Sequence, residues 1–254
     1  MDFLIVEKRG HVTTITLNRP SVMNALNPEM QAGLQAAFDD FAADASQRVA
    51  VLTGAGERAF CAGSDLKVRN PPPYPKNGYG GLAERFDLHK PIIAAVNGLA
   101  LGGGFELVLA CDIVVAAETA SFGLPEPRVG STALGGGIHR LVRQIGQKAA
   151  MGVLLACQRL SALEAKTLGL VNEVVPLADL TAATDRWCED ILKAAPTAIR
   201  ATKEAALRGL EEPSLAAAIQ AQATYPAWRE HFSSPNAREG SLAFVEKRPP
   251  KWSD

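Results

Sequence analysis

The chain alternates between short apolar segments and polar turns, and two hydrophobic periodicities are visible in its first sixty residues. Residues 3–20 (FLIVEKRGHVTTITLNRP) predict two short strands around a glycine turn, with alternate side chains on opposite faces of the second strand. In residues 27–44, an Asn-Pro start precedes apolar positions at helical spacing, which predicts an amphipathic helix. The apolar run at 48–56 predicts a buried strand that ends in a glycine turn.

The order strand, strand, turn and helix then recurs along the chain. It is found in residues 90–112 and, less regularly, in residues 112–130 before another helix. Residues 195–232 consist almost entirely of helix formers. We therefore expect a layered α/β fold with a repeating ββα unit in residues 1–190, followed by a C-terminal helical segment in residues 191–254.

Composition excludes several classes of protein. The 254 residues are 47% hydrophobic, which is enough for a large core, and the net charge of -1 lacks the basic patch of a nucleic-acid-binding protein. Polar residues interrupt the most apolar window, residues 91–117, so we expect no membrane span. The charged first ten residues are unlike a signal peptide. These features favour a small-molecule ligand.

The cysteines and one proline-rich loop say less about function. The chain has four cysteines without metal-ligand spacing, which indicates reduced structural thiols and a cytoplasmic location: Cys61, Cys111, Cys157 and Cys188. Residues 70–81 (NPPPYPKNGYGG) are too rich in proline and glycine for regular structure. This loop is either a solvated connection or a mobile rim of a site.

One carboxylate, Glu106, stands directly behind three glycines, Gly102 to Gly104, in an otherwise apolar stretch. Burying an uncompensated carboxylate costs several kcal/mol, so Glu106 requires a fixed partner or a function. The glycines lie where a strand gives way to a helix, and the free amides of a helix start suit an anion. That anion could be a phosphate, although neither common glycine-rich nucleotide motif is present. It could equally be an anion formed during a reaction, such as the oxygen of an enolate or of a tetrahedral adduct.

A second turn of small residues, at 59–67 (AFCAGSDLK), has the same character, with Gly63 ahead of Ser64 and Asp65. If the two turns faced each other, they would supply two amide donors to one oxygen. The alternative is purely structural: Asp65 would cap a helix and the glycines would form tight turns.

A second carboxylate, Glu126, lies between two prolines in residues 122–130 (FGLPEPRVG). Together with Glu106 it would form a pair of carboxylates in surroundings of low charge, which can separate their pKa values and allow acid and base roles. The alternative is an ion pair between Glu126 and either Arg128 or Arg140.

These motifs occur together in an order that closely resembles the enoyl-CoA hydratase (crotonase) family. The resemblance extends over essentially the whole chain, and Gly-Gly-Gly-x-Glu combined with Pro-Glu is typical of the hydratase branch. The segments that carry it are residues 18–27 (NRPSVMNALN), 54–67 (GAGERAFCAGSDLK), 90–116, 122–130, 159–175 and 238–252.

The resemblance implies a crotonase-like spiral of ββα units and the reversible hydration of a 2-enoyl-CoA thioester to a 3-hydroxyacyl-CoA. It places an oxyanion hole at the backbone amides of Ser64 and Gly103; many relatives have alanine at the position of Ser64. It also implies that Glu106 is the base toward water and that Glu126 is the main proton donor to carbon.

The resemblance further implies where the substrate binds and how the chain assembles. Coenzyme A is part of the substrate, and neither a further cofactor nor a metal is expected. The positions implied to contact the substrate are Ala25, Leu26, Ala62, Ser64, Asp65, Leu66, Lys67, Gly103 and Lys247. Lys247 would reach coenzyme A bound to a neighbouring subunit, or else be a solvated surface lysine. A homotrimer or a dimer of trimers, joined by the C-terminal helices, is implied.

Residues 130–140 (GSTALGGGIHR) depart from the usual pattern of the family and place His139 near the expected acyl pocket, although such a histidine is more often structural. Two other functions stay open. One is a different reaction of the family on an acyl-CoA, namely isomerisation, hydrolysis or retro-aldol cleavage. The other is non-catalytic binding of CoA esters. The presence of both glutamates favours hydration.

Overall fold

The computed structural model describes residues 3–253. Its larger sheet has six strands in the order β1-β2-β3-β5-β7-β10, of which only the β1–β2 pair is antiparallel. The strands are β1 (Leu4–Arg9), β2 (Val12–Leu17), β3 (Val49–Gly54), β5 (Ile92–Val96), β7 (Ile113–Ala117) and β10 (Glu173–Val175). The two strands expected in residues 3–20 and the buried strand in residues 48–56 are thereby confirmed.

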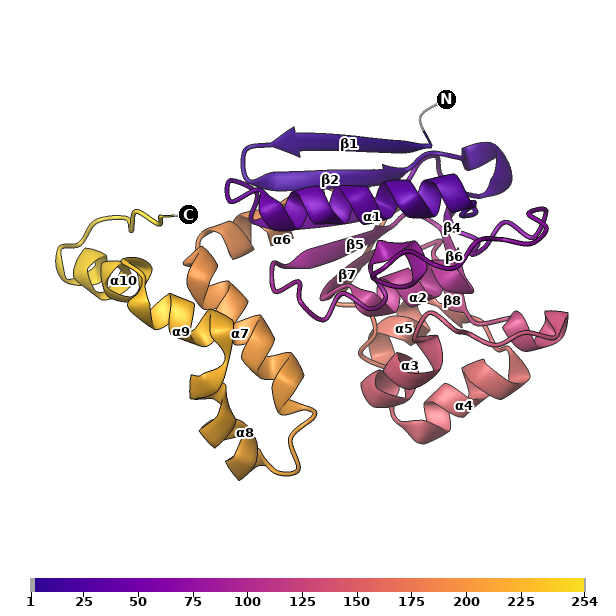
Figure 1. Ribbon diagram of the computed structural model, residues 1–254. Helices are drawn as coiled ribbons and strands as arrows, with labels where there is room; N and C mark the ends of the chain where they lie inside the picture. The colour runs from indigo at the N-terminus through magenta and orange to yellow at the C-terminus, as the bar shows by residue number, and fades with distance from the viewer. Residues whose placement is uncertain (1–2, 254) are drawn as a thin grey trace.

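A second sheet takes the strands that alternate with these along the chain. Its order is β4-β6-β8-β9, with β4, β6 and β8 parallel and β9 antiparallel. The strands are β4 (Ala59–Cys61), β6 (Leu99–Leu101), β8 (Ser121–Gly123) and β9 (Leu160–Ser161). From β3 to β8, consecutive strands enter the two sheets in turn, so this part of the chain advances as the expected spiral of ββα units (Figure 1).

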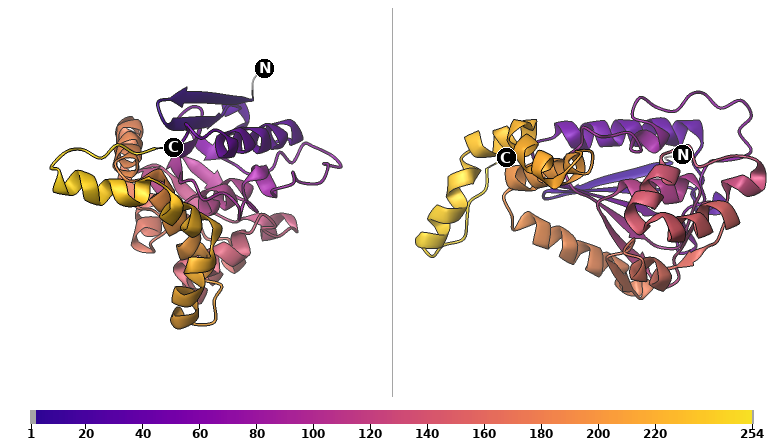
Figure 2. Two further views of the ribbon diagram at one scale, coloured as in Figure 1. Left: turned by 60° about the vertical axis from the view of Figure 1, so that its left-hand side comes forward. Right: turned by 90° about the horizontal axis from the view of Figure 1, so that it is seen from below.

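The central parallel strands β3, β5 and β7 are buried on both faces of the larger sheet, whereas β1 is mostly exposed. Ile15, Leu52, Ala94 and Val114 lie in register across four strands and belong to the main apolar core. Helix α1 (Pro28–Ala43) packs on this face; Asn27 caps it by accepting a hydrogen bond from the Met30 amide. Helix α6 (Leu180–Leu192) covers the opposite face (Figure 2).

Four short helices follow the strands at the end where β4, β6 and β8 lie (Figure 1). They are α2 (Gly103–Ala110), α3 (Gly137–Ile145), α4 (Gln147–Ala156) and α5 (Ala162–Thr167). Helix α2 begins two residues after β6 ends, and α3 packs against it. The glycines of residues 102–104 therefore lie at a junction between a strand and a helix, as predicted.

The C-terminal segment is helical and extends away from α2–α5 (Figure 1). It consists of α7 (Pro196–Gly209), α8 (Leu215–Ala221), α9 (Pro226–Ser233) and α10 (Asn236–Val245). Helix α6 contributes Leu180, Ala183 and Cys188 to the core and ends at Leu192, so it crosses the expected boundary between residues 190 and 191.

Three local features refine the sequence analysis. The strand β4 precedes the turn at Ser64, and no helix begins at Asp65. In residues 70–81, the only helical turn is a 3-10 turn at Tyr79–Gly81. All four cysteines are buried free thiols. Among residues 3–253, no helix combines the length and hydropathy that a membrane crossing would require.

Candidate active site

The two glycine-containing turns face each other, as the sequence analysis expected. Gly63 has a φ of +91°, and a Cβ atom built on it would lie 3.0 Å from the Leu101 carbonyl oxygen and 3.2 Å from the Gly103 nitrogen. A side chain at this position would thus close the space between the two backbones. We call this space the amide notch; the backbones of Ser64 on one side and Gly103 on the other border it.

The amides of Ser64 and Gly103 are available to a ligand. Within residues 3–253 neither amide donates a hydrogen bond, although the neighbouring amides of Asp65, Gly102 and Glu106 all do. Gly103 is the first residue of α2, where a free amide coincides with the positive end of the helix dipole. The amide notch can therefore hold an oxygen that carries negative charge.

Glycine is required on the α2 side because other groups approach its backbone closely. A Cβ on Gly103 would lie 2.2 Å from Cζ of Tyr79, and a Cβ on Gly104 would lie 2.2 Å from the Cys61 carbonyl oxygen. Tyr79 is only 1% exposed. The buried ring of Tyr79 thus forms part of the wall beside the amide notch.

Glu106 lies on the first turn of α2 and is 3% exposed. Its Oε1 accepts a hydrogen bond from the Gly137 amide (2.8 Å), and the Gly135 amide also stabilises the carboxylate. Burial nevertheless raises the pKa of Glu106 to about 7, and the nearby charge of Glu126 adds to this effect. Glu106 can therefore exchange a proton near neutral pH.

Glu126 begins a 3-10 turn, Glu126–Val129, that follows β8. Its Oε1 would lie 3.0 Å from a Cβ on Gly102, next to the amide notch. Its Oε2 is buried and has no hydrogen-bond partner within residues 3–253, and burial raises the pKa of this carboxyl group.

The alternative ion pairs of Glu126 are not formed. Arg128 donates instead to the Ala156 carbonyl oxygen (3.4 Å), and Arg140 donates to the Ala83 carbonyl oxygen (2.6 Å). The carboxylate of Glu126 is thus held beside the amide notch with one oxygen unsatisfied by the protein.

Tyr74 brings the loop of residues 70–81 to the two carboxylates. Its ring meets the Tyr79 ring edge-on, with ring centroids 5.3 Å apart. Tyr74 itself is 44% exposed. Burial raises the pKa of Tyr74, and the charges of Glu106 and Glu126 contribute to the shift. Of the two roles left open for this loop, its position favours the rim of a site.

The segments implied to bind coenzyme A lie side by side. Leu26 forms an isolated parallel bridge with Ser64, in which the Leu26 amide donates to the Gly63 carbonyl oxygen (2.8 Å). The Asp65 amide in turn donates to the Leu26 carbonyl oxygen (2.9 Å), and the Ala62 amide donates to the Met23 carbonyl oxygen (3.0 Å). The structure therefore assembles the two segments that contain Ala25, Leu26 and Ala62–Lys67.

Asp65 does not cap a helix. Its carboxylate accepts hydrogen bonds from the Lys67 amide (3.1 Å) and from the Arg19 guanidinium (3.0 Å), which lower its pKa. Arg19 also donates to the Ala25 carbonyl oxygen (2.6 Å) and so ties the two segments together. The alternative prediction that Asp65 caps a helix is therefore wrong: its side chain stabilises a loop.

The remaining candidate residues lie at the surface. Leu66 and Lys67 are exposed beside the bridge between Leu26 and Ser64, and His139 is exposed on α3. Lys247 is exposed just after α10, which lies far from α2 in the same chain (Figure 1). The structure thus brings the predicted site residues together except for Lys247, whose predicted contact is with a neighbouring subunit.

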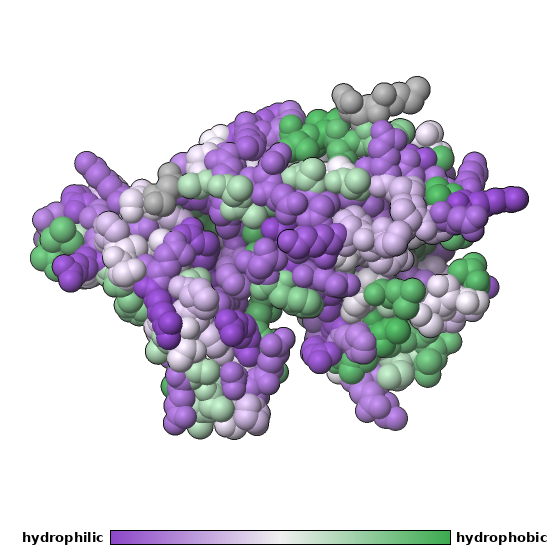
Figure 3. All heavy atoms as spheres, viewed as in Figure 1, coloured by the Kyte–Doolittle hydropathy of each residue, from purple (hydrophilic) through white to green (hydrophobic). Residues whose placement is uncertain are grey.

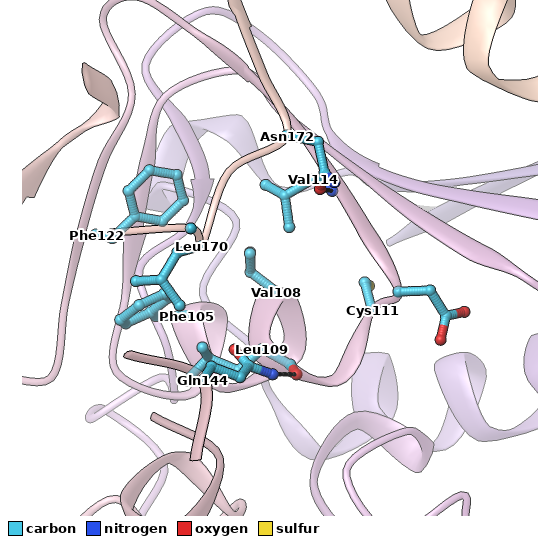
Figure 4. Close-up of a pocket in the computed structure, with 11 residues that line it drawn as sticks. Phe105, Val108, Leu109, Cys111, Val114, Phe122, Gln144, Leu170 and Asn172 are labelled. Carbon is cyan, nitrogen blue, oxygen red and sulfur yellow. Dashed lines mark hydrogen bonds between the residues drawn. The ribbon is translucent and has the colours of Figure 1, made fainter. Parts of the chain in front are cut away.

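A separate cavity of about 220 Å³ lies against a different face of α2 (Figure 4). Phe105, Val108 and Leu109 line it, whereas neither Glu106 nor Glu126 does. The thiol of Cys111 is also in its wall, and burial raises the pKa of that thiol far above the usual range. This cavity is not part of the carboxylate site.

Sequence reasoning missed four residues that shape the site. Gly135 and Gly137 were seen only as a departure from the family pattern, and Tyr74 and Tyr79 only as part of a low-complexity loop. The glycine run of residues 135–137 was a usable signal, because closely spaced glycines permit backbone amides to approach a buried group.

Comparison with known proteins shows the family of the chain. Residues 7–254 match the family model described as enoyl-CoA hydratase/isomerase. The (E)-benzylidenesuccinyl-CoA hydratase of Thauera aromatica is 40% identical, with 97% of each chain covered. The carnitinyl-CoA dehydratase of Proteus mirabilis is 39% identical, with 96% of this chain and 95% of the relative covered.

The fold is similar to solved structures of enoyl-CoA hydratases. A crystal structure of enoyl-CoA hydratase from Mycobacterium tuberculosis H37Rv superimposes with a TM-score of 0.93 at 38% identity, covering 100% of this chain and 99% of that chain. The superposition includes the segments of this chain that contain the glycine turns, the two glutamates and the C-terminal helices. The chain belongs to the enoyl-CoA hydratase/isomerase family.

Proposed function

We propose that this protein is an enoyl-CoA hydratase, which adds water reversibly across the double bond of a 2-enoyl-CoA thioester. The observation that carries this function is the carboxylate of Glu126, which lies near a second carboxylate, Glu106. Its Oε1 lies next to the amide notch, and its Oε2 is buried without a hydrogen-bond partner among residues 3–253. A water molecule between the two glutamates would satisfy this oxygen and would stand next to an anion-binding site.

The amide notch supplies the electrostatic part of the reaction. When water adds to the β-carbon, negative charge moves to the thioester oxygen and the thioester becomes an enolate. The amides of Ser64 and Gly103 donate hydrogen bonds to this oxygen. Precedent from other oxyanion holes gives about 3 kcal/mol of transition-state stabilisation for each donor.

The two glutamates supply the proton transfers. Glu106 accepts a proton from water while the water oxygen bonds to the β-carbon, and Glu126 gives a proton to the α-carbon. Dehydration is the reverse of these steps. The reaction requires that the two glutamates together carry one proton. The two states that place this proton on Glu106 or on Glu126 have the same net charge. The rate therefore depends on the protonation of the pair and not on that of one residue.

The rate should therefore have a bell-shaped dependence on pH. The pKa of Glu106 is about 7, so the pair loses its single proton as the pH rises through that value. We expect kcat/KM to fall tenfold for each pH unit well above 7. It should also fall in acid, where both carboxyl groups are protonated. Stopped-flow rates between pH 4 and 10 measure this profile; a constant rate from pH 6 to 10 would contradict it.

The substrate is proposed to lie with its coenzyme A portion along Ala25, Leu26 and the segment Ala62–Lys67. The bridge between Leu26 and Ser64 and the Arg19–Asp65 ion pair hold these backbones in place. Lys247 is proposed to contact the phosphates of coenzyme A bound to a neighbouring subunit. The two glutamates perform all proton transfers, so the reaction is proposed to need no cofactor.

A homotrimer or a dimer of trimers is proposed as the assembly. Its support is a set of apolar side chains that reach the surface of the C-terminal segment, part of which is visible over the helices at the left of Figure 3. These side chains are more than half exposed: Leu207, Leu210, Leu215, Ile219, Phe232 and Phe244. Sedimentation equilibrium should give three or six times the chain mass of 26.9 kDa. A monomer mass would contradict the proposal.

The cytoplasmic location is proposed as well, and four free cysteines support it because thiols persist in a reducing compartment. Cell fractionation tests it directly. Recovery of the protein in a secreted or periplasmic fraction would contradict it.

The function is tested by the decay of enoyl-thioester absorbance when the protein meets a panel of esters. The panel contains crotonyl-CoA together with longer, branched and aryl-substituted enoyl-CoA esters, each assayed with and without a metal chelator. Mass spectrometry should detect a product heavier by one water, and the chelator should leave the rate unchanged. Free coenzyme A as a product would indicate hydrolysis. An isomeric ester would indicate isomerisation, and a shortened ester would indicate retro-aldol cleavage. Binding without any product would indicate a CoA-ester-binding protein.

A further inference from the structure

A pair of hydroxyl groups adjoins the amide notch and has no part in the mechanism above. The Ser64 hydroxyl donates a hydrogen bond to the phenol oxygen of Tyr79 (3.2 Å). A Cβ atom on Gly103 would lie 2.3 Å from the same phenol oxygen. The Tyr79 oxygen therefore touches both sides of the amide notch, Ser64 on one side and the start of α2 on the other.

Within residues 3–253 the Ser64 hydroxyl is the only hydrogen-bond partner of the Tyr79 hydroxyl. The only hydrogen bond of this hydroxyl there is the one it accepts from Ser64, which leaves its own hydrogen free to donate. Tyr79 is 1% exposed, and a buried phenol usually finds a partner. Burial also raises the pKa of Tyr79 well above its usual value, so the hydroxyl keeps its proton at the pH values where enzymes work.

The surroundings of Tyr79 fix its position. Its ring lies against the Gly103 backbone and meets the Tyr74 ring edge-on. The 3-10 turn that it begins packs on α1, where the Gln31 side chain accepts a hydrogen bond from the Gly80 amide (3.3 Å). Because the ring cannot swing away, its hydroxyl is held beside the place where a thioester oxygen would lie.

We infer that Tyr79 is a third hydrogen-bond donor to the thioester oxygen, and that the Ser64 hydroxyl is a positioning group that directs the Tyr79 proton into the amide notch. This inference rests on the proposed function, since the ligand is the thioester of an enoyl-CoA. Tyr79 becomes a catalytic residue in this scheme, whereas the Ser64 side chain acts through it and the Ser64 amide acts directly.

The inference is tested by Tyr79→Phe, which removes the hydroxyl and keeps the ring. We expect kcat to fall on the order of 10²-fold, as is typical when one oxyanion-hole donor is lost, with KM changed by less than about threefold. Ser64→Ala should give a smaller loss of kcat, and Ser64→Thr should restore most of it. The matched control is Tyr225→Phe, which removes another buried tyrosine hydroxyl, one that donates to Glu212 in the C-terminal segment.

A spectrum separates donation to the thioester from a structural role. Hydrogen bonds to the carbonyl oxygen of a conjugated thioester shift its absorbance to longer wavelength. A cinnamoyl-CoA ester bound to the Glu126→Gln variant, in which turnover is slow, should show this shift when the spectrum is recorded before hydration. Adding Tyr79→Phe should move the absorbance maximum back toward that of the free ester, and adding Tyr225→Phe should not move it.

An unchanged shift in the Tyr79→Phe background would overturn the inference, even if kcat had fallen, because the hydroxyl would then act elsewhere. Should Tyr79→Phe fail to fold, the Ser64→Ala and Ser64→Thr pair gives the same spectral test. Failure of the proposed function is a separate result: the unaltered protein would hydrate no enoyl-CoA ester. The two failures can be distinguished because the spectrum of the bound ester does not depend on turnover.

Discussion

Glu126→Gln should fold and bind acyl-CoA, yet lose turnover by on the order of 10³-fold, within the range of general acid–base catalysis. The substitution preserves the shape of the side chain while it removes the proton that goes to the α-carbon. Glu106→Gln should cost a similar factor, because it removes the base that activates water. The measurement is kcat on the best ester of the panel.

The double variant makes this prediction sharper. Because the two carboxylates act on one water molecule, Glu106→Gln combined with Glu126→Gln should lose little more than either single variant. Glu118→Gln is the matched control, since Glu118 is exposed in the turn after β7. Multiplicative losses would show that the glutamates act independently, and unchanged turnover in Glu126→Gln would remove that residue from the mechanism.

Gly103→Ala should lower kcat by on the order of 10²–10³-fold and lower stability. The added methyl group would lie 2.2 Å from Cζ of the buried Tyr79 ring, so either the ring or the start of α2 must move. Overpacking of this kind costs about 1–3 kcal/mol, and displacement of the Gly103 amide removes a donor whose loss costs about 10²–10³-fold in kcat. Thermal unfolding and kcat measured on the same preparation test both effects.

Gly209→Ala is the matched control for this substitution. Gly209 ends α7, and a Cβ there would lie 3.6 Å from the Ala218 Cβ, which is an ordinary contact. We expect unchanged turnover and a stability equal to or above that of the unaltered chain, since alanine favours a helix. A Gly103→Ala variant with the same behaviour as this control would refute the amide notch as the oxyanion site.

The glycine turn and the placement of Glu106 behind it follow from local sequence. A helix start exposes its amides wherever it occurs, and three glycines between a strand and a helix permit a ligand to approach them. The position of the Gly103 amide and the placement of Glu106 on the first turn of α2 follow from residues within a few positions of each other. The strands and the first helix could be predicted for the same reason, because periodicity is a local property.

Tertiary packing decided which residues form hydrogen bonds with the side chains of the site. Glu106 accepts its hydrogen bond from Gly137, 31 residues away, and Tyr79 meets Ser64 across 15 residues. The failure of Arg128 and Arg140 to pair with Glu126 was also invisible in the sequence, because both arginines find carbonyl oxygens elsewhere in the fold. Spacing along the chain does not determine which segments a spiral of ββα units brings together.

The sequence by itself therefore predicted the first strands, the first helix and the glycine turn ahead of Glu106, since these depend on local periodicity and on the absence of side chains at glycine. The pairing of Glu106 with Glu126 and of the Ser64 and Gly103 amides was implied by the resemblance to the family. Only the tertiary structure decided that Glu126 keeps an unsatisfied oxygen, that burial raises the pKa of Glu106 to about 7, and that a tyrosine from an irregular loop joins the amide notch. Burial and electrostatic fields are sums over distant segments, and they exist only once the chain has folded.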